Sequence, residues 1–127
     1  LLHVTSDSDF VGRLSTYLFV SSGGRPAAGV AIRLFRLTDG ARELLCETVS
    51  DADGRCPAPL LAGKAFQPGR YEIVFQIGAY FRARGVAAAE PAFLDEVPIR
   101  FGVARAGEHY HVPLLISPYG YSTYRGS

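Results

Sequence analysis

The stretch that decides the fold class is YEIVFQI at residues 71–77, because an aromatic or large aliphatic side chain stands at every second position. Those positions are Tyr71, Ile73, Phe75 and Ile77. Successive side chains of a β-strand point to opposite faces, so a period of two is typical of a strand that buries one face. The segment therefore predicts a half-buried β-strand.

The same alternation recurs along the chain. It is clear at residues 14–20 and 97–103, and we expect further strands at 29–37, 44–50 and 109–117. Turn-forming pairs separate these segments, namely Gly23-Gly24, Asp39-Gly40, Asp53-Gly54 and Pro68-Gly69. Residues 80–88, rich in alanine and arginine, form the one stretch with a helical composition. Short strands with regular turn signals predict an all-β fold, a two-sheet β-sandwich.

Length and composition indicate one folded domain. The chain has 127 residues, of which 48% are hydrophobic and 20% are charged. This length suits a single domain, and this composition can fill a core. Because no linker, repeat or low-complexity tract interrupts the chain, we expect an N-terminal arm at residues 1–12 and one domain at residues 13–127.

Net charge and cysteine content limit which classes of partner and which cellular compartment are expected. The 13 Lys and Arg residues nearly balance the 12 Asp and Glu residues, so no basic field attracts nucleic acid or a membrane surface. No apolar run approaches the ~18 residues of a membrane span. Cys46 and Cys56 form neither a disulfide framework nor a zinc motif, and two reduced thiols are typical of an intracellular protein. We expect a cytoplasmic protein, with a removed leader ahead of Leu1 left open.

Histidines are the first candidates for chemistry. His3 lies in the arm, whereas His109 and His111 stand two apart in the expected strand 109–117 and would share a face. A pair at this spacing can hold a metal ion, but no third ligand is near, and we predict no metal and no cofactor. A polar group at a sheet surface is the commoner role for such a histidine.

Two other segments stand out. Residues 51–55, DADGR, begin like a calcium-binding loop, but the later ligands and the closing glutamate are missing. A turn that presents Arg55 at a sheet edge is the simpler interpretation. The tail at 117–127 is dense in tyrosine, and we expect it to dock on its own fold or on a neighbouring subunit, since it would otherwise expose an aromatic patch.

Five segments together resemble the 5-hydroxyisourate hydrolases, the enzyme branch of the transthyretin fold. They are YHVPLL at 110–115, YSTYRGS at 121–127, GRPAAGV at 24–30, ADGR at 52–55 and FLDEVPI at 93–99. The resemblance runs from about Arg13 to Ser127. Its most specific part is the terminal YRGS, which transthyretin lacks.

This resemblance implies a homotetramer of transthyretin-like sandwiches with one short helix and with sites at the dimer–dimer interface. It also implies a small-molecule substrate, 5-hydroxyisourate, hydrolysed in urate breakdown. The residues that would act in catalysis are His111, Arg55, Ser127 and, at an altered position, Tyr17. The residues that would bind substrate are Tyr124, Arg125, Gly126 and His109.

The first strand departs from the family pattern Ser/Thr-Thr-His-Val-Leu-Asp. Residues 15–20 read STYLFV, so Tyr17 takes the place of the catalytic histidine and Val20 the place of the acid. A phenol with a pKa near ~10 donates or orients at neutral pH and seldom accepts a proton. Losing one acid–base partner costs on the order of 10²–10⁴ in rate, which predicts a weakened hydrolase.

The remaining residues suit the opening of an electron-poor lactam, which needs an activated water and a cation facing the oxyanion. Neutral His111 can be the base, Arg55 the cation, and Ser127 can offer its hydroxyl and carboxylate. Two other functions stay open. One alternative is a repurposed enzyme of the same fold that acts on another lactam, imide or cyclic precursor in a biosynthetic pathway. The other is a non-catalytic, transthyretin-like ligand-binding protein.

Overall fold

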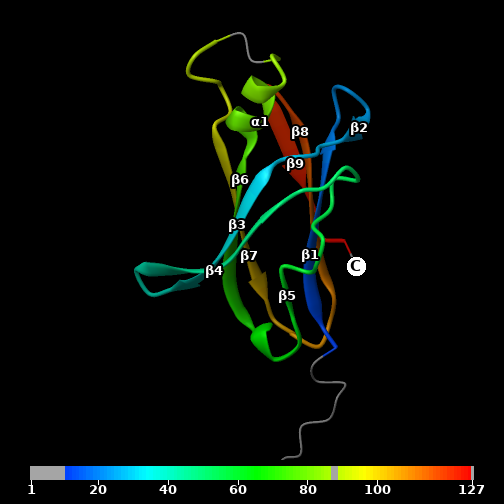
Figure 1. The fold of residues 1–127 in the computed structure, drawn as a ribbon. Coiled ribbons are helices and arrows are strands. Elements are labelled where there is room, and N and C mark those ends of the chain that lie inside the picture. The colour runs from blue at the N-terminus through cyan, green and yellow to red at the C-terminus, as the bar shows by residue number, and fades with distance from the viewer. Residues whose placement is uncertain (1–10, 87–88, 127) are drawn as a thin grey trace, which may run out of the picture.

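The computed structural model describes residues 11–86 and 89–126. Nine strands, a short 3-10 helix at Gly63–Ala65 and one α-helix make up this part of the chain (Figure 1). The strands are β1 (Arg13–Val20), β2 (Arg25–Pro26), β3 (Ala31–Thr38), β4 (Ala41–Val49), β5 (Leu61–Ala62), β6 (Gly69–Gln76), β7 (Glu96–Val103), β8 (Tyr110–Ser117) and β9 (Gly120–Thr123), and the helix α1 is Ile77–Ala83.

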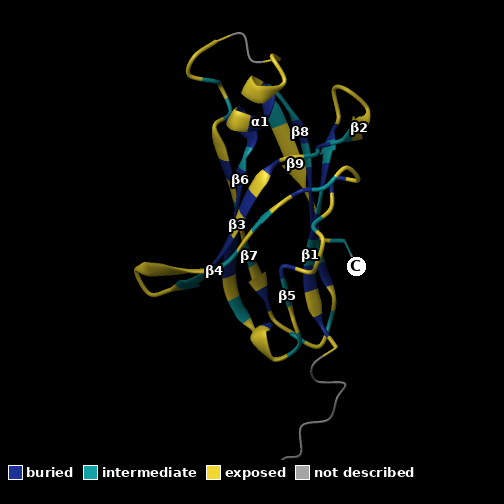
Figure 2. Ribbon diagram, viewed as in Figure 1, coloured by how far each residue is buried: buried dark blue, intermediate teal, exposed yellow. Residues whose placement is uncertain are grey.

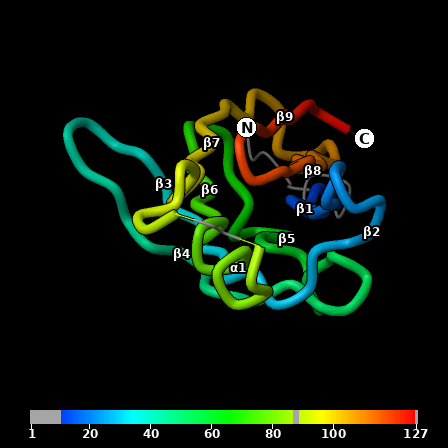
Figure 3. Tube along the Cα trace, turned by 90° about the horizontal axis from the view of Figure 1, so that it is seen from above, coloured from blue at the N-terminus to red at the C-terminus, as the bar shows by residue number. Residues whose placement is uncertain are grey.

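The strands form two sheets. One has the order β2-β1-β8-β9 with β5 beside β1, and the other has the order β4-β3-β6-β7. Seen from above, β1, β8 and β9 lie on one side of the molecule and β3, β6 and β4 on the other (Figure 3). The predicted all-β, two-sheet sandwich with one short helix is therefore confirmed. No helix within the described ranges is long and apolar enough to cross a membrane.

The core lies between the two sheets, where the inner faces of the strands are buried (Figure 2). Tyr71, Ile73 and Phe75, the alternating residues of β6, have no exposed surface. In β1 the residues at even positions are buried, and Val20 is only 4% exposed. A side chain at position 20 therefore points into the core, on the opposite face from Tyr17, and an acid there would be buried without reaching the outer face.

Two elements differ from the sequence prediction. The helix predicted at 80–88 was wrong in position, because α1 begins at Ile77 and ends at Ala83; residues 87–88 lie outside the described part. The buried side chains of Ile77, Tyr80 and Phe81 tie this earlier stretch to the core, and Gly85, at φ +69°, turns the chain away from the helix. The tail contributes a further edge strand, β9, that the alternation did not reveal.

The predicted arm falls largely on residues 1–10, which the structure does not describe. Its last residue, Gly12, packs closely against the loop between β7 and β8. An added Cβ would lie 1.8 Å from the carbonyl oxygen of Ala106. The sandwich thus holds the chain from Gly12 onward.

Candidate functional site

Strand β1 brings three of the predicted catalytic residues to one outer face. It runs parallel to β8, and this register sets Ser15 opposite His111. On its other side, Tyr17 forms an isolated antiparallel bridge with Arg55. Ser15, Tyr17 and His111 are half-buried, and Arg55 is exposed. The arginine and the histidine, 56 positions apart in the chain, thus flank one strand.

Asp51, the first residue of the turn that carries Arg55, stabilises that turn through its side chain. The Asp51 carboxylate accepts hydrogen bonds from the backbone N–H groups of Asp53, at 2.9 Å, and of Arg55, at 3.1 Å. Gly54 has φ +75°, and its carbonyl accepts a 2.8 Å hydrogen bond from the N–H of Leu18 in β1. Residues 51–55, which begin like a calcium-binding loop, therefore form a turn that fixes Arg55 beside β1, as predicted.

The guanidinium of Arg55 lies over the ring of Tyr17, with 4.9 Å between its Cζ and the ring centroid. Tyr17 in turn stacks on Phe19, with ring centroids 6.2 Å apart and planes inclined by 29°. A cation over an aromatic face is stabilised by about 0.5–1 kcal/mol at an exposed site. Tyr17 thus supports the arginine, and together with Phe19 it forms an aromatic surface on this face of the sheet.

His111 is held by a neighbour that the sequence analysis did not single out. The Oγ of Ser15 and the Nδ1 of His111 are joined by a 2.8 Å hydrogen bond. Burial lowers the pKa of His111 below its usual value of 6.5, and the nearby positive charge of Arg55 lowers it further. The imidazole is therefore neutral at pH 7, with Nδ1 occupied, and Nε2 is the nitrogen left to exchange a proton.

The tail returns to the same histidine. After β9, Gly126 forms an antiparallel bridge with His111, and its N–H donates a 2.7 Å hydrogen bond to the histidine carbonyl. A Cβ on Gly126 would stand 3.1 Å from Cδ2 of the imidazole, so a residue without a side chain fits here. Ser127 lies outside the described residues. Seen from above, the C-terminal end lies on the side of the molecule formed by β8 and β9 (Figure 3).

Arg125 anchors this tail. Its Nη2 donates to Oε1 of Glu108 at 3.0 Å and to the carbonyl of His109 at 3.3 Å, and its Cζ lies 3.9 Å from the centroid of the Tyr110 ring. His109 is exposed and immediately precedes β8, so this strand begins one residue later than predicted. Tyr124 is 60% exposed.

The structure thus gathers Tyr17, Arg55, His111 and Gly126, whereas the side chain of Arg125 is engaged elsewhere. Ser15 is the residue that sequence reasoning missed. It carried one usable signal, because it stands two positions before Tyr17 and therefore on the same face of the strand. The described residues hold no group of three or more metal-ligating side chains.

Comparison with known proteins identifies the architecture. Residues 14–126 match the model of the HIUase/Transthyretin family. The chain belongs to this family. A relative from Mesorhizobium japonicum named 5-hydroxyisourate hydrolase is 60% identical over 116 residues, which are 91% of this chain and 93% of the relative.

Two solved structures are also similar. A 5-hydroxyisourate hydrolase of Klebsiella pneumoniae shares 35% identity with a TM-score of 0.76, covering 93% of this chain and 96% of its own. An (S)-allantoin synthase shares 42% identity with a TM-score of 0.89 over 96% of this chain. This chain spans only 46% of the synthase chain.

The close fit of Gly54 under β1 predicts a position-specific cost for a side chain. An added Cβ would lie 2.3 Å from the Leu18 carbonyl oxygen, whereas at Gly40, which has a similar φ of +70°, it would meet nothing within 4 Å. Gly40→Ala should lower the free energy of unfolding by about 1–2 kcal/mol, the cost of the left-handed conformation. Gly54→Ala should cost clearly more, measured by urea unfolding. Equal losses would show that the turn does not press on β1.

The link between Arg55 and His111 predicts a shift in titration. Arg55→Gln removes a positive charge that disfavours the imidazolium, so the pKa of His111 should rise toward 6.5. Proton NMR of the imidazole Cε1–H across about pH 4.5 to 8.5, roughly two units on either side of the usual value, measures this pKa. The matched control is Arg33→Gln, on the other sheet, which should leave it unchanged. An unchanged or lower pKa in Arg55→Gln would contradict the geometry described above.

Proposed function

We propose that this chain hydrolyses 5-hydroxyisourate, opening its cyclic amide in urate breakdown. The observation that carries the proposal is the convergence of Arg55 and His111 on the outer face of β1, beside the returning tail. The names of the family relatives support the substrate. A base that activates water and a cation that stabilises the oxyanion are groups that favour amide hydrolysis.

In the proposed reaction, Nε2 of neutral His111 takes a proton from water as the water oxygen bonds to the lactam carbonyl carbon. Arg55 faces the oxygen of that carbonyl and balances the negative charge that develops there. The carbon–nitrogen bond then breaks, and the proton on His111 passes to the leaving nitrogen. The single ring-opened product carries a carboxylic acid and a ureide, the acid releases its proton to solvent to become the carboxylate, and the imidazole is neutral again.

The tail completes the proposed site. The contact between Gly126 and His111 supports a role for the next residue, Ser127, whose hydroxyl or carboxylate would hold the water or the ureide nitrogens. Tyr124, exposed on the same segment, would contact substrate, and His109 would line the rim. The ion pair with Glu108 supports a positioning role for Arg125, which would hold the tail in place.

We further propose that the site works in a homotetramer, at an interface between dimers. In the single chain the residues of the site lie on the outer face of a sheet, and large aromatic side chains lie exposed near its edge, among them Tyr119, Tyr121 and Tyr124. A second copy covering this face would enclose the substrate and bury these rings. The unpaired Cys46 and Cys56 support a cytoplasmic compartment.

The direct test is to generate 5-hydroxyisourate from urate with urate oxidase and to follow its ultraviolet decay. Added wild-type protein should speed the decay, whereas Arg33→Gln should match wild type and His111→Asn should be about 100-fold slower or worse. Decay at the spontaneous rate with wild-type protein would contradict the proposal.

A substitution of Tyr17 distinguishes the weakened hydrolase from the repurposed enzyme in the same assay. In a weakened hydrolase, Tyr17→His restores a group that titrates near neutrality, so the decay should become faster. The position of Tyr17 beneath Arg55 is what favours the repurposed enzyme, because a phenol there could orient a different ring. No gain from Tyr17→His, together with slow wild-type turnover, would favour that second function.

A further inference from the structure

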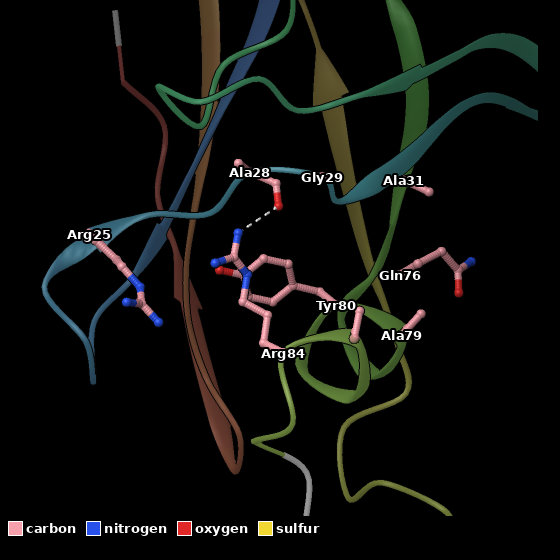
Figure 4. Close-up of a pocket in the computed structure, with 9 residues that line it drawn as sticks. Arg25, Ala28, Gly29, Ala31, Gln76, Ala79, Tyr80 and Arg84 are labelled. Atoms are coloured by element: carbon pink, nitrogen blue, oxygen red, sulfur yellow. Dashed lines mark hydrogen bonds between the residues drawn. The ribbon is translucent and has the colours of Figure 1, made fainter.

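A cavity lies between α1 and the segment that joins β2 to β3, away from the proposed hydrolytic site. Its volume is about 530 Å³. At one end are Arg25, Tyr80 and Arg84, and at the other is Gln76 (Figure 4). Small residues form the wall between them, namely Ala28, Gly29, Ala31, Ala79 and Ala83. Neither Arg55 nor His111 lines it.

No acid among the described residues forms an ion pair with either arginine of this cavity. Some other arginines pair with acids, for example Arg42 and Arg100 with the buried Glu72. Within residues 11–86 and 89–126, no carboxylate lies within ion-pair distance of Arg25 or Arg84. Arg84 donates one long hydrogen bond, 3.4 Å, to the carbonyl of Ala28 (Figure 4). One end of the cavity is therefore cationic.

Tyr80 supplies the second observation. It is only 4% exposed, and among the described residues its hydroxyl has no hydrogen-bond partner. Buried polar groups are nearly always paired, so an orphan one calls for an explanation. The guanidinium of Arg84 lies 5.0 Å from the centroid of its ring. A smaller cavity of about 180 Å³ is lined by the same three residues, Arg25, Tyr80 and Arg84, which places them between two open spaces.

We propose that this cavity binds a small organic carboxylate. The planar forks of Arg25 and Arg84 suit the two oxygens of a carboxylate, and the hydroxyl of Tyr80 would donate to the same anion. The alanine and glycine wall accommodates an apolar body, which a bare inorganic anion lacks. The site is separate from the hydrolytic face, because it uses the helix end and β2 rather than the outer face of β1 and β8.

The test uses benzoate, with the neutral benzamide as its matched probe and inorganic phosphate as a second anion, titrated into the full chain by calorimetry. Benzoate should bind and benzamide should not. The double variant Arg25→Gln/Arg84→Gln should weaken benzoate binding at least about 10-fold. Arg105→Gln, which removes an exposed arginine of equal charge in the loop between β7 and β8, should leave the dissociation constant unchanged.

Tyr80→Phe gives a readout that does not depend on finding a tight ligand. Because the hydroxyl is buried without a partner, its removal should raise the melting temperature of the free protein while weakening benzoate binding. A lower melting temperature would mean that the hydroxyl is satisfied, and it would overturn the assignment. Equal binding of benzamide, unchanged binding by the double variant, binding of phosphate without benzoate, or no binding of either anion would each overturn it too.

Discussion

The parallel pairing of β1 with β8 is the constraint on which the site depends. It joins segments 96 positions apart and sets Ser15 beside His111, while the other edge of β1 receives the turn that carries Arg55. Side chains alternate along a strand, so a slip of one residue in this register would turn His111 into the core and move Val112 outward. The fully buried Leu14, Leu18 and Leu114 oppose such a slip. The apolar core thus fixes the polar face.

The strands of the sandwich were predictable because their pattern is local. Alternation located β1, β6 and β7 to within two residues, and Asp39-Gly40 marked a hairpin turn. The helix was misplaced because composition pointed to 80–88, whereas the packing of Ile77 against the core decides where α1 begins. The edge strand β9 escaped notice because its register comes from pairing with β8, not from its own residues.

The site was predictable only in part. Resemblance named Arg55, His111 and the tail, and spacing alone could not have joined them, since no periodicity reports a contact between residues 17 and 55. Ser15 and the anchoring of Arg125 by Glu108 became visible only with the fold. Tyr17 gains a physical role there, because the guanidinium of Arg55 lies over its ring and the phenol side chain supports the cation.

In the proposed reaction Arg55 and His111 act together, because the cation stabilises the charge that the base helps to create. A double-mutant cycle on the turnover of 5-hydroxyisourate measures this directly, with Arg55→Gln, His111→Asn and the combination. Residues that act as a unit are strongly non-additive, so the combined variant should fall within about threefold of the slower single variant. Rate losses that multiply in the combined variant would contradict the account, because they would mean that the two residues act independently.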